Sequence, residues 1–287
     1  MIEHQLDLFA DAGARAEPCL SQSTGRPLAA SDMDDAALIA AIPESSLTDS
    51  AALTAEATRR RLAGAVPALA ALCRRFAGFG GDRIVPEQAA ALRALVAIGG
   101  HEAAHAVSEM IQRGVVRGPT LIVAVAAAAE LRAPLPVEVL RSLLQHAEPG
   151  IRVAACRCAR PFPELIAVLI DLLGDLDRTV ARSAACALGR LGRTEARPAL
   201  MDLLRSRPSE DVIGSVSSIA DEECMVLLGR IARSTPGLAD AALDALESID
   251  NARADAIAAA VRRLQRSSAT LGLLVPLPPR MVVRHSE

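Results

Sequence analysis

The chain has 287 residues, a net charge of −3 and a hydrophobic fraction of 51%, with no Trp, no Tyr and only four Phe. This charge produces no strong field that would draw the chain to nucleic acid or to an anionic membrane. Aromatic and β-branched residues favour strands, and aromatics usually fill globular cores. A chain rich in alanine and leucine therefore indicates closely packed helices rather than a sheet.

The sequence carries no feature of secretion or membrane insertion. Six cysteines are present without an apolar signal-peptide segment at the N-terminus, which predicts reduced thiols inside the cell. The longest uncharged apolar run, Leu121 to Ala129, is far shorter than the roughly 20 residues of a membrane span. We expect a soluble cytoplasmic protein that makes no contact with a membrane.

The N-terminus contains the pentapeptide Gln5-Leu6-Asp7-Leu8-Phe9. It resembles, residue for residue, the peptide by which bacterial polymerases and repair proteins dock on the replicative sliding clamp. The resemblance implies that Leu8 and Phe9 fill an apolar pocket on the clamp. Gln5 would hydrogen-bond at a second subsite, and Leu6 would add contact area. A few deeply anchored apolar residues make such a peptide specific at weak to moderate affinity.

The alternatives for this pentapeptide are a chance apolar patch and a helix start that packs on the first repeat. Residues 10–32 are rich in Ala, Gly, Ser and Pro without a period, which predicts a flexible linker. From Asp34 to Ile42 the pattern favours a short amphipathic helix, with Ser31 or Asp32 as N-cap and Pro43 as its end. We assign residues 1–47 to an N-terminal arm, whose linker would let a tethered module reach a clamp.

The first predicted helical pair is locally basic. Its arginines are Arg59, Arg60, Arg61, Arg74 and Arg75. Guanidinium groups bind phosphate, so these residues are candidates for contact with DNA or with a partner; a solvated helix face is the alternative. Excision of a flipped base is discounted, because the chain has no Trp or Tyr to stack on it.

An internal repeat dominates the middle of the chain. Arg152-Val-Ala-Ala-Cys156 recurs as Arg182-Ser-Ala-Ala-Cys186, at an offset of 30 residues. Residues 94–111 align with residues 187–204, at an offset of 93 residues or three periods of 31. Self-similarity at such a period is the signature of a stacked repeat architecture.

One repeat unit extends from Val180 to Arg207. Val180, Ala184, Leu188 and Leu191 follow helical spacing, and Gly192 provides the positive-φ stop. A second apolar helix follows and ends before Pro208. Two such helices cannot bury both of their faces alone, so neighbouring pairs must stack.

The pattern Asp177-x-x-Val180-Ala-x-x-Ala184-Ala185-x-Ala187-Leu188-Gly189-x-Leu191-Gly192 resembles the HEAT/armadillo-like repeat, including the phycobilin lyase-type variety. The resemblance covers roughly residues 50–265. It implies an all-α, right-handed solenoid of about six antiparallel helix pairs over residues 48–266, followed by an apolar, proline-rich tail over residues 267–287. The resemblance concerns the fold and does not assign a function by itself. We expect a non-catalytic binding scaffold without a cofactor or small-molecule substrate.

His101-Glu102-Ala-Ala-His105 matches the zinc-metallopeptidase signature, and Glu130 is a distant third ligand in that reading. The repeat argues against it. At the 93-residue offset Glu102 is matched by Glu195, whereas the two histidines are matched by Thr194 and Pro198. Gly99-Gly100 places the motif at a helix start rather than inside a long helix.

Three functions remain open at this stage. The first is a scaffold that the N-terminal pentapeptide tethers to the bacterial sliding clamp in DNA replication or repair. The second is a zinc-dependent peptidase, and the third is a general assembly or chaperone-like scaffold.

Overall fold

The computed structural model describes residues 29–46 and 48–272, with side chains up to residue 266. This part of the chain forms fifteen α-helices connected by loops and short 3-10 helices, and it contains no strand. The prediction of an all-helical fold is confirmed. None of these helices combines the length and the apolar character needed to cross a membrane.

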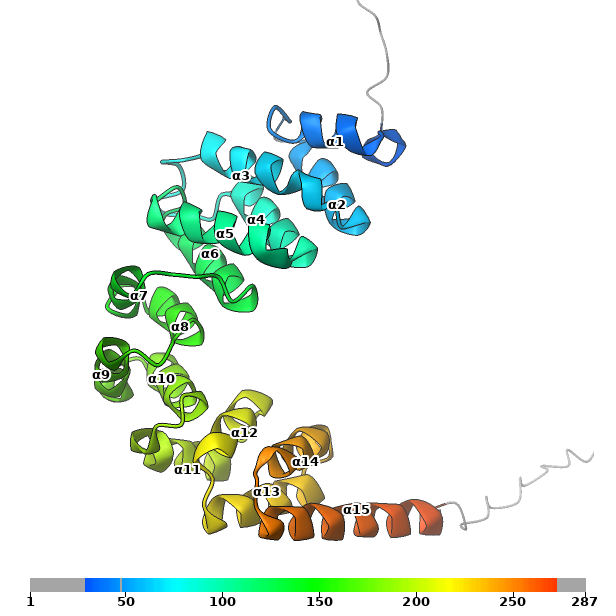
Figure 1. The fold of residues 1–287 in the computed structure, drawn as a ribbon, viewed down its shortest axis with the longest axis vertical. Coiled ribbons are helices and arrows are strands. Elements are labelled where there is room, and N and C mark those ends of the chain that lie inside the picture. The colour runs from blue at the N-terminus through cyan, green and yellow to red at the C-terminus, as the bar shows by residue number, and fades with distance from the viewer. Residues whose placement is uncertain (1–28, 47, 273–287) are drawn as a thin grey trace, which may run out of the picture.

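The helices form an open arc of two layers (Figure 1). Each even-numbered helix lies on the inside of the arc and packs on the next, from α2 to α14. These inner helices are α2 (Ser50–Arg60), α4 (Pro86–Ile98), α6 (Pro119–Glu130), α8 (Pro149–Arg157), α10 (Arg178–Arg190), α12 (Glu210–Val216) and α14 (Ala239–Ser248). The odd-numbered helices from α3 onward form the outer layer. They are α3 (Val66–Arg75), α5 (Gly100–Gln112), α7 (Val137–Leu144), α9 (Pro163–Asp171), α11 (Arg197–Ser206), α13 (Glu222–Ser234) and α15 (Ala252–Gly272).

The outer layer is interrupted where the inner layer is continuous. α3 packs on α5, α7 on α9 and α13 on α15, whereas clefts lie between α5 and α7 and between α9 and α11. On the inside, Gly189 of α10 lets α12 approach so closely that a Cβ there would lie 2.4 Å from the Ser215 oxygen. Close inner contacts and wider outer spacing bend the stack into an arc.

The predicted repeat unit is confirmed as α10 followed by α11. Asp177 caps α10, because its carboxylate accepts hydrogen bonds from the backbone N–H of Thr179 and Val180. Gly192 has a φ of 69°, and Gly99, its counterpart 93 residues earlier, has a φ of 73°. The left-handed backbone that only glycine adopts cheaply thus ends both inner helices of the aligned pairs.

A single hydrophobic core runs between the two layers and consists mainly of alanine and leucine. Phe79 and Phe162 lie outside it, with 64% and 41% of their surfaces exposed. Small alanine side chains let neighbouring helices approach, and leucines fill the remaining volume. The prediction of closely packed helices without an aromatic core is confirmed.

The stack begins with α1 (Asp35–Ala41), whose Leu38 is fully buried together with Ile42. The predicted N-cap was wrong. Asp34 caps α1 through a 2.7 Å hydrogen bond from the Ala37 N–H, because the 3-10 helix η1 (Ala30–Asp32) occupies the preceding residues.

The core therefore begins within the segment assigned above to the arm. With α10 and α11 as one unit, the described helices from α2 to α15 form seven pairs, one more than the six predicted, and α1 precedes them as an additional helix on α2. The last helix, α15, continues past residue 266 to Gly272. A seven-residue helix beside a linker shows too little periodicity to be counted as a repeat from sequence.

Candidate interaction surfaces

An apolar groove lies on the inner surface between α4 and α6. It has a volume of about 340 Å³ and is lined in part by half-buried Val96, Ile122, Val123 and Ala126. The exposed side chains of Arg93 and Glu130 add opposite charges to its lining. A groove with an apolar floor and a few charged groups is suited to bind part of another protein.

The composition of α6 explains why this groove exists. The helix reads Pro-Thr-Leu-Ile-Val-Ala-Val-Ala-Ala-Ala-Ala-Glu and is apolar on every side. Such a helix is normally buried all round. Here α4, α5 and α8 pack around it, while the face that carries Ile122 and Val123 stays partly open to the inside of the arc. Gly150 of α8 helps to place Ile122, since a Cβ there would lie 2.8 Å from its Cδ1.

Charge is unevenly distributed along the inner layer. From α2 to α10 the inner helices carry the arginines Arg59, Arg60, Arg93, Arg152, Arg157, Arg178, Arg182 and Arg190. The helices α12 and α14 carry no arginine and instead hold the carboxylates Glu210, Asp211, Asp240, Asp244 and Glu247. With the carboxylates Glu56, Glu87 and Glu130 included, the inner layer is still net positive from α2 to α10 and net negative in α12 and α14. Arg60, Arg152 and Arg190 are paired with carboxylates, and Arg178 and Arg182 line a cleft on the outer side.

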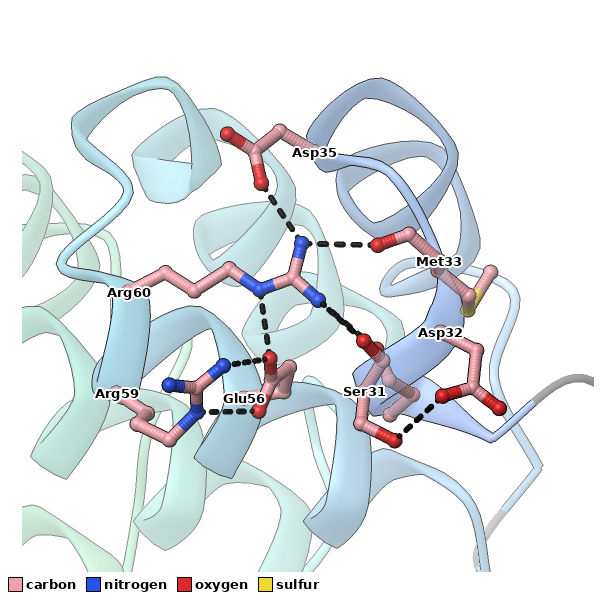
Figure 2. A network of polar contacts seen from close by, with 8 residues as sticks. Ser31, Asp32, Met33, Asp35, Glu56, Arg59 and Arg60 are labelled. Carbon is pink, nitrogen blue, oxygen red and sulfur yellow. Dashed lines mark hydrogen bonds and ion pairs between the residues drawn. The ribbon is translucent and has the colours of Figure 1, made fainter.

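Arg60, one of the predicted phosphate contacts, serves the fold (Figure 2). Its guanidinium donates to Glu56 Oε1 at 2.6 Å, to the Met33 carbonyl at 2.8 Å and to Asp35 Oδ1 at 2.8 Å. It also donates to the carbonyls of Ala30 and Ser31. Arg60 thus fastens η1 and α1 to α2, and few of its donors are left for a ligand.

The other predicted arginines differ in how far they are engaged. Arg59 makes a bidentate pair with Glu56, and the two guanidinium groups of Arg59 and Arg60 lower the pKa of Glu56 to about 2. Arg75 donates to the carbonyls of Pro43 and Ser45 and lies over the Phe76 ring. Arg61 and Arg74 are exposed and remain candidate contacts.

The two histidines of the zinc-like motif lie in the first turns of α5. His101 and His105 are exposed, and their rings are parallel with centroids 6.3 Å apart. Glu130 lies at the end of α6. Among the residues that the structure describes, no group of three or more His, Cys, Asp or Glu is arranged to hold a metal ion. The structure therefore does not bring Glu130 together with His101 and His105 as a set of three metal ligands.

The cysteines of the repeats are packing residues. Cys156 and Cys186 hold equivalent places in adjacent inner helices and are fully buried. Burial raises the pKa of the Cys156 thiol to about 12 and that of Cys186 to about 11. Both thiols therefore stay protonated at neutral pH, which disfavours metal binding and nucleophilic chemistry.

The pentapeptide from Gln5 to Phe9 lies outside the described residues, so its role stays a prediction. The inner groove was not predicted as a site, although the sequence contains its signal. The run Leu121 to Ala129 was considered only as a membrane span, whereas its excess of apolar residues provides the open face of α6.

Comparison with known proteins supports the repeat architecture. Residues 137–220, which cover α7 to α12, match the family model for HEAT repeats. A search of curated proteins finds no match to the chain. Repeats of this kind build extended concave surfaces that bind other proteins.

Proposed function

We propose that this protein is a non-catalytic scaffold that binds a protein partner on its inner surface and is tethered to the bacterial sliding clamp by its N-terminal peptide. The observation that carries the first half is the partly open apolar face of α6 within a continuous inner layer. Exposed apolar surface costs free energy unless a partner covers it. The groove between α4 and α6 is the place where a partner gains most from burial.

The charge distribution favours a protein partner over DNA. Duplex DNA is uniformly negative, so the unpaired arginines of the inner layer would attract it while the carboxylates of α12 and α14 would repel it. A protein partner that has both an acidic and a basic region would be attracted to both ends of the inner layer. A brief contact with DNA through Arg61 or Arg74 is compatible with this arrangement.

The tether to the clamp rests on the sequence of residues 5–9 and on the number of residues between them and the first described helix. Nineteen residues lie between Phe9 and Ala29, where the described part of the chain begins. If these residues form the flexible linker that the sequence predicts, its mean end-to-end distance would be ~25 Å. A clamp bound at Leu8 and Phe9 would leave the inner surface free for a second protein.

Calorimetric titration of the full chain with a bacterial sliding clamp tests the tether. We expect micromolar binding that the Leu8→Ala/Phe9→Ala double variant abolishes. An Ala12→Ser/Ala14→Ser double variant is a matched control, because it changes two residues of the same segment outside the pentapeptide. It should bind like the wild type.

Two results would overturn the tether. Absence of binding at high concentration would leave a general assembly scaffold whose inner surface alone acts. Binding that survives the double variant would place the clamp contact elsewhere on the chain. Neither result would alter the scaffold assignment, which rests on the inner surface.

A further inference from the structure

A cleft of about 510 Å³ opens on the outer side where α9 and α11 separate. It is lined by the 3-10 helix η3 (Leu172–Gly174), by the first turns of α10 and by the length of α11. This cleft is larger than the inner groove and is formed by other helices. It exists because the outer layer is interrupted at this point.

The lining of this cleft is basic. Three arginines line it, Arg178, Arg182 and Arg207, against the single carboxylate of Asp202. The hydroxyls of Thr179 and Ser206 add polar groups. Asp177 lies nearby but is engaged as the cap of α10, where it accepts hydrogen bonds from the Thr179 N–H at 2.7 Å and the Thr179 hydroxyl at 2.5 Å.

Arg182 is the member of the repeat that lacks its counter-ion. One repeat earlier, Arg152 reaches the residues before the next inner helix and forms a bidentate ion pair with Asp175, with both distances 2.9 Å. Arg182 makes the corresponding contact before α12, but its partner is the Ser209 hydroxyl at 2.6 Å. A hydroxyl satisfies one N–H and leaves the positive charge uncompensated.

Apolar side chains accompany these charges. Leu173 and Leu203 line the cleft and are half-buried. A ligand that fits therefore carries negative charge beside an apolar group.

We propose that this cleft binds an acidic peptide segment of a protein partner, with carboxylates on Arg178, Arg182 and Arg207 and an adjacent apolar side chain against Leu173 and Leu203. Guanidinium groups bind carboxylates through paired, charge-assisted hydrogen bonds, which gives such a cleft its specificity. The site is formed by other helices than the inner groove, so the solenoid has a second binding surface on its outer side.

Fluorescence anisotropy with the full chain and no clamp tests this site. The probe is a short fluorescein-labelled peptide with glutamates on both sides of one leucine, and its control replaces every glutamate by glutamine. We expect the acidic peptide to bind, the glutamine peptide not to bind, and binding to weaken as salt increases. Arg178→Gln/Arg207→Gln should weaken binding at least tenfold.

The matched control is Arg113→Gln/Arg230→Gln, which removes the same charge from exposed sites away from the cleft and should bind within twofold of wild type. Equal loss in both variants would show a non-specific charge effect and overturn the site. Absence of binding to the wild type would overturn it as well. A third peptide with phosphoserine in place of glutamate separates the two sources of negative charge, and binding of that peptide alone would contradict the carboxylate assignment.

Discussion

The junction between α10 and α12 gives the sharpest test of how the inner layer is packed. A Cβ on Gly189 would lie 2.4 Å from the Ser215 backbone oxygen and 2.7 Å from Leu200 Cδ1. The leucine methyl can turn away, but the oxygen belongs to the backbone of α12. Relief to an ordinary contact needs α12 to move by about 0.6 to 1 Å, since atoms in close-packed interiors do not overlap.

The predicted free energy of unfolding follows from two opposing contributions. Alanine is favoured over glycine in a helix by about 1 kcal/mol. Overpacking of a filled site costs about 1–3 kcal/mol, and a clash with backbone belongs at the upper end of that range. Gly189→Ala should therefore lower the free energy of unfolding by about 1–2 kcal/mol.

Gly214→Ala in α12 is the matched control. A Cβ there meets nothing within 4 Å. The helix-propensity gain is then unopposed, and the variant should be more stable than wild type by up to about 1 kcal/mol. Urea unfolding followed by circular dichroism compares the two midpoints. If Gly189→Ala stabilises the protein as much as Gly214→Ala does, α10 and α12 do not pack as closely as described.

Three further predictions concern the core and the network at the start of the stack. Leu144→Ala, at a fully buried position, should reduce the free energy of unfolding by about 2–5 kcal/mol in the same assay. The pKa of Glu56 is lowered to about 2, so its contribution to the free energy of unfolding is complete above pH 4.5 and is lost as the pH falls towards 2. A Glu56→Gln variant should lose less stability than the wild type over that interval. An equal loss in the two proteins would contradict the pairing with Arg59 and Arg60. Cys156 and Cys186 should react with iodoacetamide in urea but not in the native protein, as peptide mapping by mass spectrometry would show; native labelling would contradict their burial.

The sequence was sufficient for the architecture because each repeat unit encodes its own fold. A single unit contains all of the local signals, which are the helical spacing of apolar residues in α10, the N-cap at Asp177 and the glycine at position 192 that ends the helix. The 93-residue alignment then extends them to α4 and α5. The helix predicted from Asp34 to Ile42 is present as α1, but its place in the stack was not predicted, since it depends on a contact with α2 through Arg60 that no local pattern encodes.

The candidate surfaces were harder to predict for a physical reason. An apolar residue that faces the inside of the arc is chemically like one that faces the core. The sequence alone therefore cannot show that Ile122 is partly open whereas Leu140 is buried. The same holds for the arginines. Arg60 and Arg178 are equally basic in sequence, and only the fold shows that the first is engaged by α1 while the second lines an open cleft.

Hydrogen exchange of the full chain, alone and saturated with a bacterial sliding clamp, tests the central claim most directly. The proposed arrangement predicts that the clamp slows exchange at the backbone amides of residues 5–9 and leaves α4, α6 and α8 unchanged, so that the inner surface stays available to its own partner. Slower exchange on α4 and α6 with no change at residues 5–9 would contradict the account, because the clamp would then occupy the inner surface itself.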